Sequence, residues 1–335
     1  MKIHWTADYD MVGNGYGYST HNKNMRAALE RCGVEFREDA DLAVHITTPP
    51  SFEPVEGKYN VLFTMYEAAT LPEEWPERMK GADLLVVPCT WNRQLFSKYY
   101  KGPIEVVPEG YKPEKFELTR REFPKDSKFM FLWVGASNPR KGYEHVLLAW
   151  QQWLKRYPET LHKVHLYMKT TQSLRAERVV DVSRCDVTVD IRDWEFSELT
   201  ELYKMAHCFL FPSMGEGWGL TLMEAMGTGM PCIYTPWSAM TDWVPKKHAY
   251  PLKFNMKQID TVKQVGEDRG KVYHHSKAAS PDIDDLVRKM YRVYTHYEEA
   301  AHKGYYAGKA IQHMTWDRAG RIFLEKVLPH YEAAA

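Results

Sequence analysis

Short apolar runs alternate with amphipathic stretches along the whole chain. Apolar runs of about four to eight residues are typical of buried strands, and the amphipathic stretches between them predict helices that cover a parallel sheet. The pattern therefore predicts an α/β protein. In the first half, the expected strands are 3–6, 42–47, 59–65, 83–88 and 104–107, and the expected helices include 19–31 and 92–100.

A second series of the same kind begins at residue 129. The stretch before it, 111–128, is charged, contains two prolines and lacks a sustained period, which is typical of a linker. We therefore expect two domains, 1–120 joined by a C-terminal helix 316–335, and 121–315. In the second series, strands are expected at 129–134, 164–169, 187–191, 208–212 and 231–235, and helices at 142–157, 197–205, 220–226, 282–313 with a break near 302–304, and 316–331.

Length and composition agree with this organisation. A chain of 335 residues is long enough to form two domains that each bury a hydrophobic core. No apolar stretch reaches the roughly 20 residues of a membrane span, and the N-terminus lacks the features of a secretion signal. The five cysteines are widely spread without metal-ligand spacing, so we expect reduced thiols in a cytoplasm. The 44 basic residues balance the 44 acidic ones, which disfavours a nucleic-acid binder while leaving a local basic patch open.

The strongest chemical signal is the segment 209–234, where a buried strand leads into a Gly-rich turn and a helix. A helix N-terminus offers unpaired N–H groups and a positive dipole end, which suit a diphosphate. Gly217 and Gly219 lack a Cβ, so a phosphate could approach the backbone there. Glu224 lies about one helical turn further on, where it can accept hydrogen bonds from ribose hydroxyls, and Glu216 can face a separate polyol. The plainer interpretation is that Glu216 caps the helix and Glu224 is a solvated surface residue.

A second motif, 131–150, joins a strand to an amphipathic helix through the basic turn Arg140-Lys141-Gly142. Cations at the carboxyl end of a strand can neutralise the charge that grows on a departing diphosphate. The alternative is an ordinary basic surface turn.

Several weaker candidates leave two interpretations open. Glu67 ends a strand and can either take a proton from an acceptor hydroxyl or cap the next helix. Arg192 ends another strand and can either flank a nucleotide base or pair with an acid. Asp8 and Asp10 form a D-x-D pair, but they follow the first strand rather than one in mid-chain, which disfavours a metal site. The glycines of 13–17 stand too far from the first strand for a dinucleotide fingerprint, and a mobile surface loop is one interpretation of them.

Residues 209–234 resemble the E-x7-E signature of the retaining glycosyltransferases of the family 4 group, and the similarity extends over most of the chain. The resemblance implies the GT-B fold, in which two Rossmann-like, doubly wound domains face each other across a cleft. It places Glu224 on the donor ribose, Glu216 on the transferred sugar, and Arg140 and Lys141 on the leaving phosphate. The other positions that it implies are the donor-binding Gly15, Arg192, Gly217, Trp218, Gly219, Leu220 and Thr221, and the acceptor-side Gly13, Gly17, His21 and Tyr66, with Glu67 as a catalytic candidate.

The resemblance has one departure and several open ends. Many members carry an arginine directly after the glycine of the strand, where this chain has Ala136, so Arg140 is expected to supply that charge. The implied activity moves a sugar from a nucleotide donor, UDP- or GDP-linked, with retention and without a metal or other cofactor. A GT-B phosphorylase or epimerase and a non-catalytic sugar-nucleotide or glycan-binding protein are the alternatives. The acceptor is a glycan, a small molecule, a protein or a modified DNA base.

Overall fold

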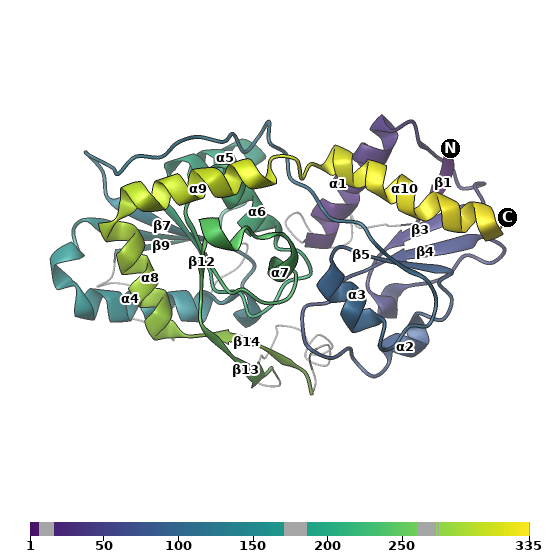
Figure 1. The fold of residues 1–335 in the computed structure, drawn as a ribbon, viewed down its shortest axis with the longest axis horizontal. Coiled ribbons are helices and arrows are strands. Elements are labelled where there is room, and N and C mark those ends of the chain that lie inside the picture. Colours follow the sequence, from purple (N-terminus) through teal and green to yellow (C-terminus); the bar gives the residue numbers. More distant parts are fainter. Residues whose placement is uncertain (7–16, 171–185, 260–272, 274, 335) are drawn as a thin grey trace.

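Two parallel sheets of six strands each form the framework of the chain (Figure 1). The computed structural model describes residues 1–6, 17–170, 186–259, 273 and 275–334. The first sheet has the order β2-β1-β3-β4-β5-β6 and the second β12-β11-β10-β7-β8-β9. Their strands are β1 (Lys2–Trp5), β2 (Glu35–Phe36), β3 (Leu42–Ile46), β4 (Tyr59–Phe63), β5 (Leu84–Val87) and β6 (Ile104–Val106), then β7 (Phe129–Val134), β8 (Val164–Lys169), β9 (Val187–Asp190), β10 (Cys208–Phe211), β11 (Cys232–Tyr234) and β12 (Tyr250–Pro251).

Helices cover both faces of the first sheet. Side chains on a strand alternate between faces, so Val61 and Phe63 of β4 pack under α1 (Gly17–Arg31) and α10 (Trp316–Ala334). Leu62 points to the other face, towards α2 (Trp75–Arg78) and α3 (Thr90–Phe96). Burial on both faces explains why these strands are apolar at successive positions.

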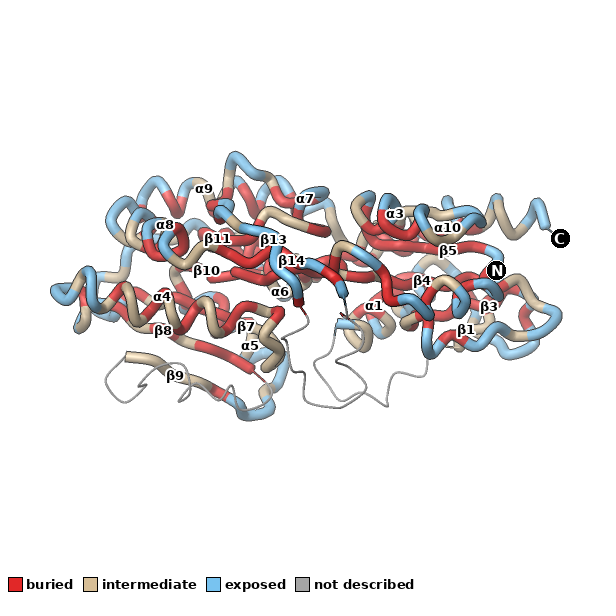
Figure 2. The backbone as a smooth tube through the Cα atoms, turned by 90° about the horizontal axis from the view of Figure 1, so that it is seen from below, coloured by how far each residue is buried: buried red, intermediate tan, exposed pale blue. Residues whose placement is uncertain are grey.

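The second sheet is layered in the same way. On one face α4 (Tyr143–Arg156) and α8 (Ile283–Thr295) cover Phe131 and Trp133, and on the other α5 (Phe196–Met205), α6 (Leu220–Gly227) and α9 (Tyr297–Ile311) cover Phe209 and Phe211. Figure 2 shows the inner strands of both sheets, such as β8, β10 and β5, mainly in red, whereas the edge strand β9 is mainly tan. The α/β class and the parallel sheets predicted from the sequence are therefore confirmed.

The predicted break in the long C-terminal helical region is wrong in position. The helix is interrupted at His296, between α8 and α9, and 302–304 lies inside α9. Gly304 is part of that helix, and a Cβ at this position would lie 2.4 Å from the Gly229 carbonyl oxygen. The glycine therefore allows α9 to pack closely on the turn after α6, and it does not end a helix.

An antiparallel pair, β13 (Phe254–Gln258) and β14 (Lys277–Pro281), escaped the sequence prediction. No residue of β13 is buried, so the strand lacks the apolar alternation on which the prediction rests. The pair contacts both domains. Ala279 N–H donates to Met214 O at 3.0 Å in the second domain, and Ala69 N–H in the first domain donates to Lys277 O at 2.9 Å.

The two domains are connected by two chain segments that lie side by side. Tyr111, on the first segment, forms a parallel bridge with Thr315 on the second, and its N–H donates to Met314 O at 3.1 Å. Beyond this crossing, α10 packs along α1, as the yellow and purple helices of Figure 1 show.

Arg121 fixes the first connecting segment to the second domain. Its guanidinium donates to the carbonyls of Tyr203, Lys204 and Ala206 at the C-terminal end of α5, and to Thr228 Oγ1 at 2.8 Å. These carbonyls have no later helical turn to bond, so the arginine satisfies them.

Replacing Arg121 by alanine is expected to lower the free energy of unfolding of the second domain by about 2–4 kcal/mol, since it leaves buried carbonyls without a donor. Chemical denaturation followed by circular dichroism measures the change. Arg120→Ala is the matched control, because Arg120 is exposed and lies over the Tyr305 ring. Equal destabilisation by the two variants would contradict this role.

None of the described helices is both long and apolar enough to cross a membrane.

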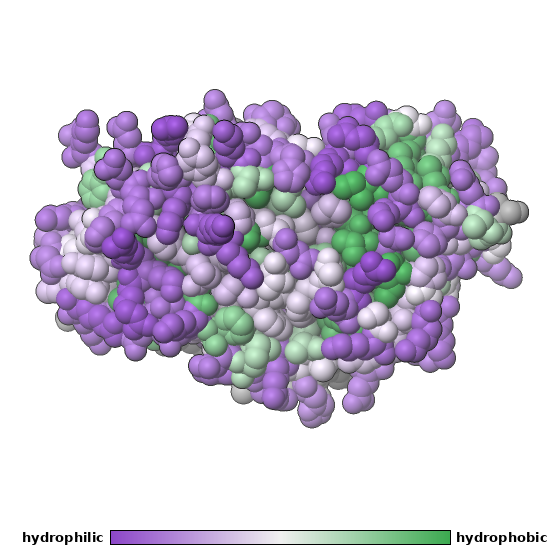
Figure 3. Space-filling model, in the orientation of Figure 1, coloured by the Kyte–Doolittle hydropathy of each residue, from purple (hydrophilic) through white to green (hydrophobic). Residues whose placement is uncertain are grey.

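On the face shown in Figure 3, hydrophobic side chains gather over the first domain between α10 and α3, and the second domain is mainly hydrophilic.

Candidate active site

Glu216 lies at the centre of a buried polar cluster in the turn between β10 and α6. Its Oε2 accepts a hydrogen bond from Lys141 Nζ at 2.6 Å and lies 3.4 Å from Arg140 Nη1. Its Oε1 accepts a hydrogen bond from Ser213 Oγ at 2.7 Å, and its own N–H donates to Ser238 Oγ at 2.9 Å. Glu216 is only 5% exposed. Hydrogen bonds to its side chain and from its backbone N–H fix its position.

Glu216 and Arg140 stay ionised despite their burial. Burial by itself would raise the pKa of Glu216, but the neighbouring Lys141 and Arg140 outweigh it and lower that pKa. Burial likewise opposes the charge of Arg140, yet Glu67, Tyr273 and Glu216 hold its pKa above the ordinary value. The turns after β7 and β10 thus bring two cations and a carboxylate together.

Arg140 and Lys141 have different environments. Arg140 is 7% exposed, donates to the Gly215 carbonyl, and forms an ion pair with Glu67, with 2.9 Å between Nη2 and Oε1. The side chain of Lys141 is 26% exposed and contacts Glu216. Lys141 is therefore the more accessible cation, whereas the guanidinium of Arg140 already contacts Gly215 O and Glu67.

The carboxyl end of β4 in the first domain supplies Glu67. Its Oε1 accepts hydrogen bonds from Arg140 and from the phenol of Tyr273. Glu67 does not cap the next helix, since α2 begins at Trp75 with Glu74 at its N-cap. The acceptor-side position predicted for Tyr66 is not what the structure shows. Its side chain is 1% exposed, because it packs inside the domain against Trp75 and Tyr273.

The helix α6 begins at Leu220, with Gly219 as its N-cap in the left-handed region, φ 96° and ψ 50°. This backbone conformation favours glycine. The helix has no side-chain cap, so Glu216 does not cap it. Leu220 and Thr221 are half-buried in its first turn.

Glu224 follows one turn later in α6 and is half-buried. Burial raises its pKa to about 8, against the opposing effects of a 3.3 Å hydrogen bond from Tyr203 Oη and of the charge of Lys112. It is therefore not a solvated surface residue. A half-buried carboxyl group with few protein partners is well suited to accept hydrogen bonds from a ligand.

The approach of a phosphate to Gly217 stays a prediction, and the structure gives a second reason for the missing Cβ of this residue. A Cβ there would lie 2.4 Å from Met65 Sδ, so the glycine lets the first domain approach the turn. Trp218 is 3% exposed, and its carbonyl accepts a hydrogen bond from Trp243 Nε1 at 2.9 Å. Its side chain therefore belongs to the core of the second domain, and its backbone to the turn.

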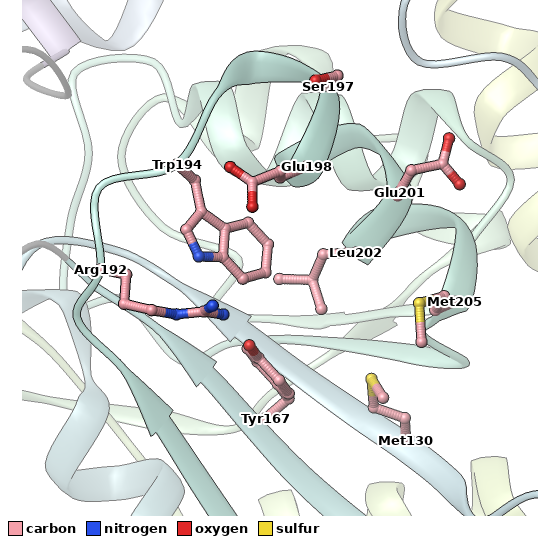
Figure 4. A pocket seen from close by; sticks show the side chains of 9 residues that line it. All are labelled: Met130, Tyr167, Arg192, Trp194, Ser197, Glu198, Glu201, Leu202 and Met205. Atoms are coloured by element: carbon pink, nitrogen blue, oxygen red, sulfur yellow. The ribbon is translucent and has the colours of Figure 1, made fainter.

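Arg192 pairs with an acid, which was one of its two interpretations. Nη2 lies 2.5 Å from Asp190 Oδ2, and the guanidinium lies 5.4 Å from the Trp194 ring centre. A cavity of about 400 Å³ opens beside this pair, and Figure 4 shows Arg192, Trp194 and Tyr167 along its edge. The contact of Arg192 with a nucleotide base stays a prediction.

The prediction that His21 lines the acceptor side does not agree with its position. His21 is 0% exposed, with Nδ1 2.9 Å from the buried Glu109 Oε1, and its ring packs on Phe63. It is an internal residue of α1, whose first residue is Gly17. Gly13, Gly15, Asp8 and Asp10 lie outside the described residues. Within the described part of the chain, no group of three or more histidine, cysteine or acidic side chains could hold a metal.

The sequence interpretation missed Ser213, Ser238 and Tyr273, which complete the cluster. Ser213 lies inside the Gly-rich motif, three residues before Glu216, so its spacing was a usable signal. Ser238 and Tyr273 follow the motif in segments without a recognisable pattern, and only the folded chain brings them to Glu216 and Glu67.

The raised pKa of Glu224 predicts a dependence of stability on pH. A carboxyl group whose folded pKa is about 8, against an ordinary 4.5, stabilises the fold fully below pH 4.5 and loses this contribution as the pH rises through 8. The melting temperature of the ligand-free protein is thus expected to fall by a few degrees more between pH 5 and 9 than that of Glu224→Gln, which has no proton to lose. Parallel curves for the two proteins in differential scanning fluorimetry would argue against the raised pKa of Glu224.

Parts of the chain match the sequences of known proteins. Residues 128–257 match the family model of glycosyl transferases group 1. Over 110 residues the chain is 29% identical to an O-antigen chain mannosyltransferase of Salmonella typhimurium, covering 32% of this chain and 30% of that protein. Over 210 residues it is 23% identical to a serotype-specific mannosyltransferase of Escherichia coli, covering 61% of this chain and 22% of that protein. The matches thus span less than a third of the length of these relatives.

Solved structures extend the likeness to nearly the whole chain. Sucrose-phosphate synthase of Thermosynechococcus elongatus superposes with a TM-score of 0.65 at 15% identity, covering 95% of this chain and 79% of that one. A UDP-forming α,α-trehalose-phosphate synthase of Burkholderia xenovorans gives 0.62 at 12% identity, covering 94% and 79%. The expected GT-B fold is confirmed, and the match to the glycosyl transferases group 1 model lies within the second domain.

Proposed function

From a GT-B fold whose second domain is of the group 1 glycosyltransferase type, we propose a retaining enzyme that moves a sugar from a nucleotide donor to an acceptor hydroxyl without a metal ion. The observation that carries the proposal is the contact of Lys141 with Glu216, 2.6 Å long, in the turns that follow β7 and β10. It lies at the carboxyl ends of parallel strands, where open α/β sheets bind their ligands. Glu224 follows in the next helix.

Each donor group has a counterpart in this part of the second domain. The ribose hydroxyls bind Glu224, whose half-buried carboxyl group has Tyr203 and solvent as neighbours. The diphosphate lies between the N-terminus of α6 and the ammonium group of Lys141. The sugar lies next to Glu216, whose fixed carboxylate accepts hydrogen bonds from sugar hydroxyls.

Transfer then needs charge stabilisation at the leaving group. The bond between sugar C1 and the phosphate oxygen breaks, and its electron pair leaves with the diphosphate. The acceptor oxygen bonds to C1 on the same face, and the acceptor's proton passes to the leaving phosphate oxygen. Lys141 stabilises the charge that develops on that oxygen, and Arg140 holds the turn that carries Glu216. In this scheme Glu67 positions Arg140 and takes no proton from the acceptor, since its Oε1 already accepts hydrogen bonds from Arg140 and Tyr273.

The donor and acceptor are open to a direct experiment. Two relatives are named mannosyltransferases and one structural neighbour is UDP-forming, so GDP- and UDP-linked hexoses, with mannose first, lead the screen. A thermal-shift series of UDP, GDP and ADP sugars selects the donor. Glycans, small hydroxyl compounds, proteins and DNA with modified bases are then tested as acceptors.

The same assay separates the rival functions. Sugar transfer that persists in excess chelator is expected for this mechanism, and activity lost with the chelator and restored by a divalent cation would remove metal independence. Release of sugar phosphate on adding inorganic phosphate would instead indicate a phosphorylase. Stabilisation by a nucleotide-sugar without any turnover would indicate a binding protein, and a product of inverted configuration would refute retention.

A further inference from the structure

Tyr273 belongs in sequence to the second domain, yet its side chain is buried in the first. It is 6% exposed, and its ring stacks on Tyr66 with 5.9 Å between centres. Its phenol donates a hydrogen bond to Glu67 Oε1, and its ring centre lies 6.0 Å from the Arg140 guanidinium carbon. The described residues thus place a tyrosine at the point where the two domains share an ion pair.

The backbone next to Tyr273 is anchored on both sides of the domain boundary. Ser276, which is 1% exposed, accepts a hydrogen bond from Thr70 N–H at 3.0 Å and donates to Thr70 O at 3.1 Å in the first domain. Its N–H donates to Tyr273 O at 3.0 Å. A few residues on, Ala279 bonds the backbone of Met214, two residues before Glu216. These hydrogen bonds fix the backbone from which the Tyr273 side chain reaches the cluster around Glu216.

A continuous series of contacts leads from this phenol to the proposed reacting groups. Glu67 Oε1 accepts from Tyr273 Oη and also from Arg140 Nη2 at 2.9 Å. The same guanidinium donates to Gly215 O and lies 3.4 Å from Glu216 Oε2, which Lys141 contacts at 2.6 Å. Two donors on one carboxylate oxygen restrict the rotation of Glu67, and Glu67 in turn restricts Arg140.

The series determines which cation is closest to Glu216. Arg140 is shared between Glu67 and Glu216, and its distance to Glu216 is the longer of the two. If Glu67 turned away, Arg140 would lose its nearer partner and move onto Glu216, where it would displace Lys141. The short Lys141 contact therefore depends on the position of Glu67.

We propose that Tyr273 is a positioning residue for sugar transfer, which acts through Glu67 and Arg140 to fix Glu216 and leave Lys141 to the departing diphosphate. This inference rests on the proposed function. It extends the site to a residue in the segment before β14, which no part of the Gly-rich or basic motifs contains.

The test is a double-mutant cycle in the full chain with the donor chosen by the screen. Tyr273→Phe removes only the hydroxyl and keeps the ring that stacks on Tyr66. It is expected to lower kcat about 10- to 100-fold, the effect of a small misplacement of reacting groups, with KM for the donor within about twofold. Glu67→Gln is expected to behave in the same way, and the double variant to be no slower than Glu67→Gln alone.

Tyr234→Phe is the matched control, because its hydroxyl is buried without a hydrogen-bond partner among the described residues. It is expected to keep wild-type kcat and KM. Melting temperatures of all five proteins, the wild type included, show that a loss of rate is not a loss of folded protein. All rates are measured well below the lowest of these melting temperatures, so that a Tyr273→Phe variant that melts early is still compared as folded protein.

The outcomes separate this inference from the proposed function. Wild-type kcat in Tyr273→Phe, in an enzyme that Lys141→Ala disables, would overturn the positioning role and leave the function standing. Effects of Tyr273→Phe and Glu67→Gln that multiply would show that the phenol acts elsewhere, and a rise in donor KM alone would also overturn it. A wild-type chain that transfers no sugar from any donor would overturn the proposed function itself.

Discussion

Replacing Lys141 by alanine is expected to lower the kcat of sugar transfer by about 100- to 1,000-fold, the range for removal of one group that stabilises developing charge. Arg140 cannot compensate, because it is 7% exposed and bound to Glu67 and Gly215 O. KM for the donor is expected to change only a few-fold, because α6 and Glu224 still bind the nucleotide. Steady-state kinetics at saturating acceptor measures both constants.

Lys155→Ala provides the matched control for Lys141→Ala. Lys155 is an exposed lysine in the last turn of α4, the helix that follows the Arg140-Lys141 turn. This control is expected to retain wild-type kinetics. A kcat for Lys141→Ala within threefold of the wild-type value would refute its role at the leaving group, whatever happened to KM.

At pH 9, where the Glu224 carboxyl group is ionised, replacing Glu224 by alanine is expected to weaken donor binding by about 10- to 150-fold, the range for a lost hydrogen bond to a charged group. Its carboxyl group has Tyr203 Oη as a hydrogen-bond partner at 3.3 Å, so it can accept ribose hydroxyls without breaking an ion pair. Isothermal titration with the nucleotide diphosphate measures the dissociation constant. At saturating donor, kcat is expected to stay within a few-fold of the wild-type value.

The control for Glu224→Ala is Glu298→Ala in the first turn of α9, an exposed glutamate on the same domain. It is expected to bind donor as the wild type does. Equal dissociation constants for Glu224→Ala and the wild type would place the ribose elsewhere. A loss of kcat without a change in binding would assign Glu224 to the reaction rather than to the nucleotide.

The parts of the fold that could be predicted from the sequence are those that depend on patterns within one short segment. The strand, turn and helix around Glu216 and Glu224 are contiguous, so their order was readable without the structure. The strand β13 could not be predicted from the sequence, because none of its residues is buried. The role of Gly304 in helix packing could not be predicted either. A glycine in a helical pattern looks the same whether it breaks the helix or lets another backbone approach.

Contacts between distant segments account for the rest of the site. Lys141 and Glu216 could be placed near each other only because each follows a parallel strand, and the sheet order puts β7 beside β10. The pairing of Arg140 with Glu67 depends on how the two domains meet. The burial of His21 depends on Glu109, 88 positions later in the chain, and no spacing rule connects the two.

The return of α10 to the first domain affects the order in which the chain can fold during synthesis. Trp316, Phe323 and Val327 belong to the same core as Ile3 and Val61. The ribosome makes the strands of the first sheet early, but one of the two helices that cover this face emerges only after the whole second domain. Until then, the first domain keeps apolar surface exposed, a state in which chaperones bind and aggregation begins. The second domain, though made later, has its own core complete sooner.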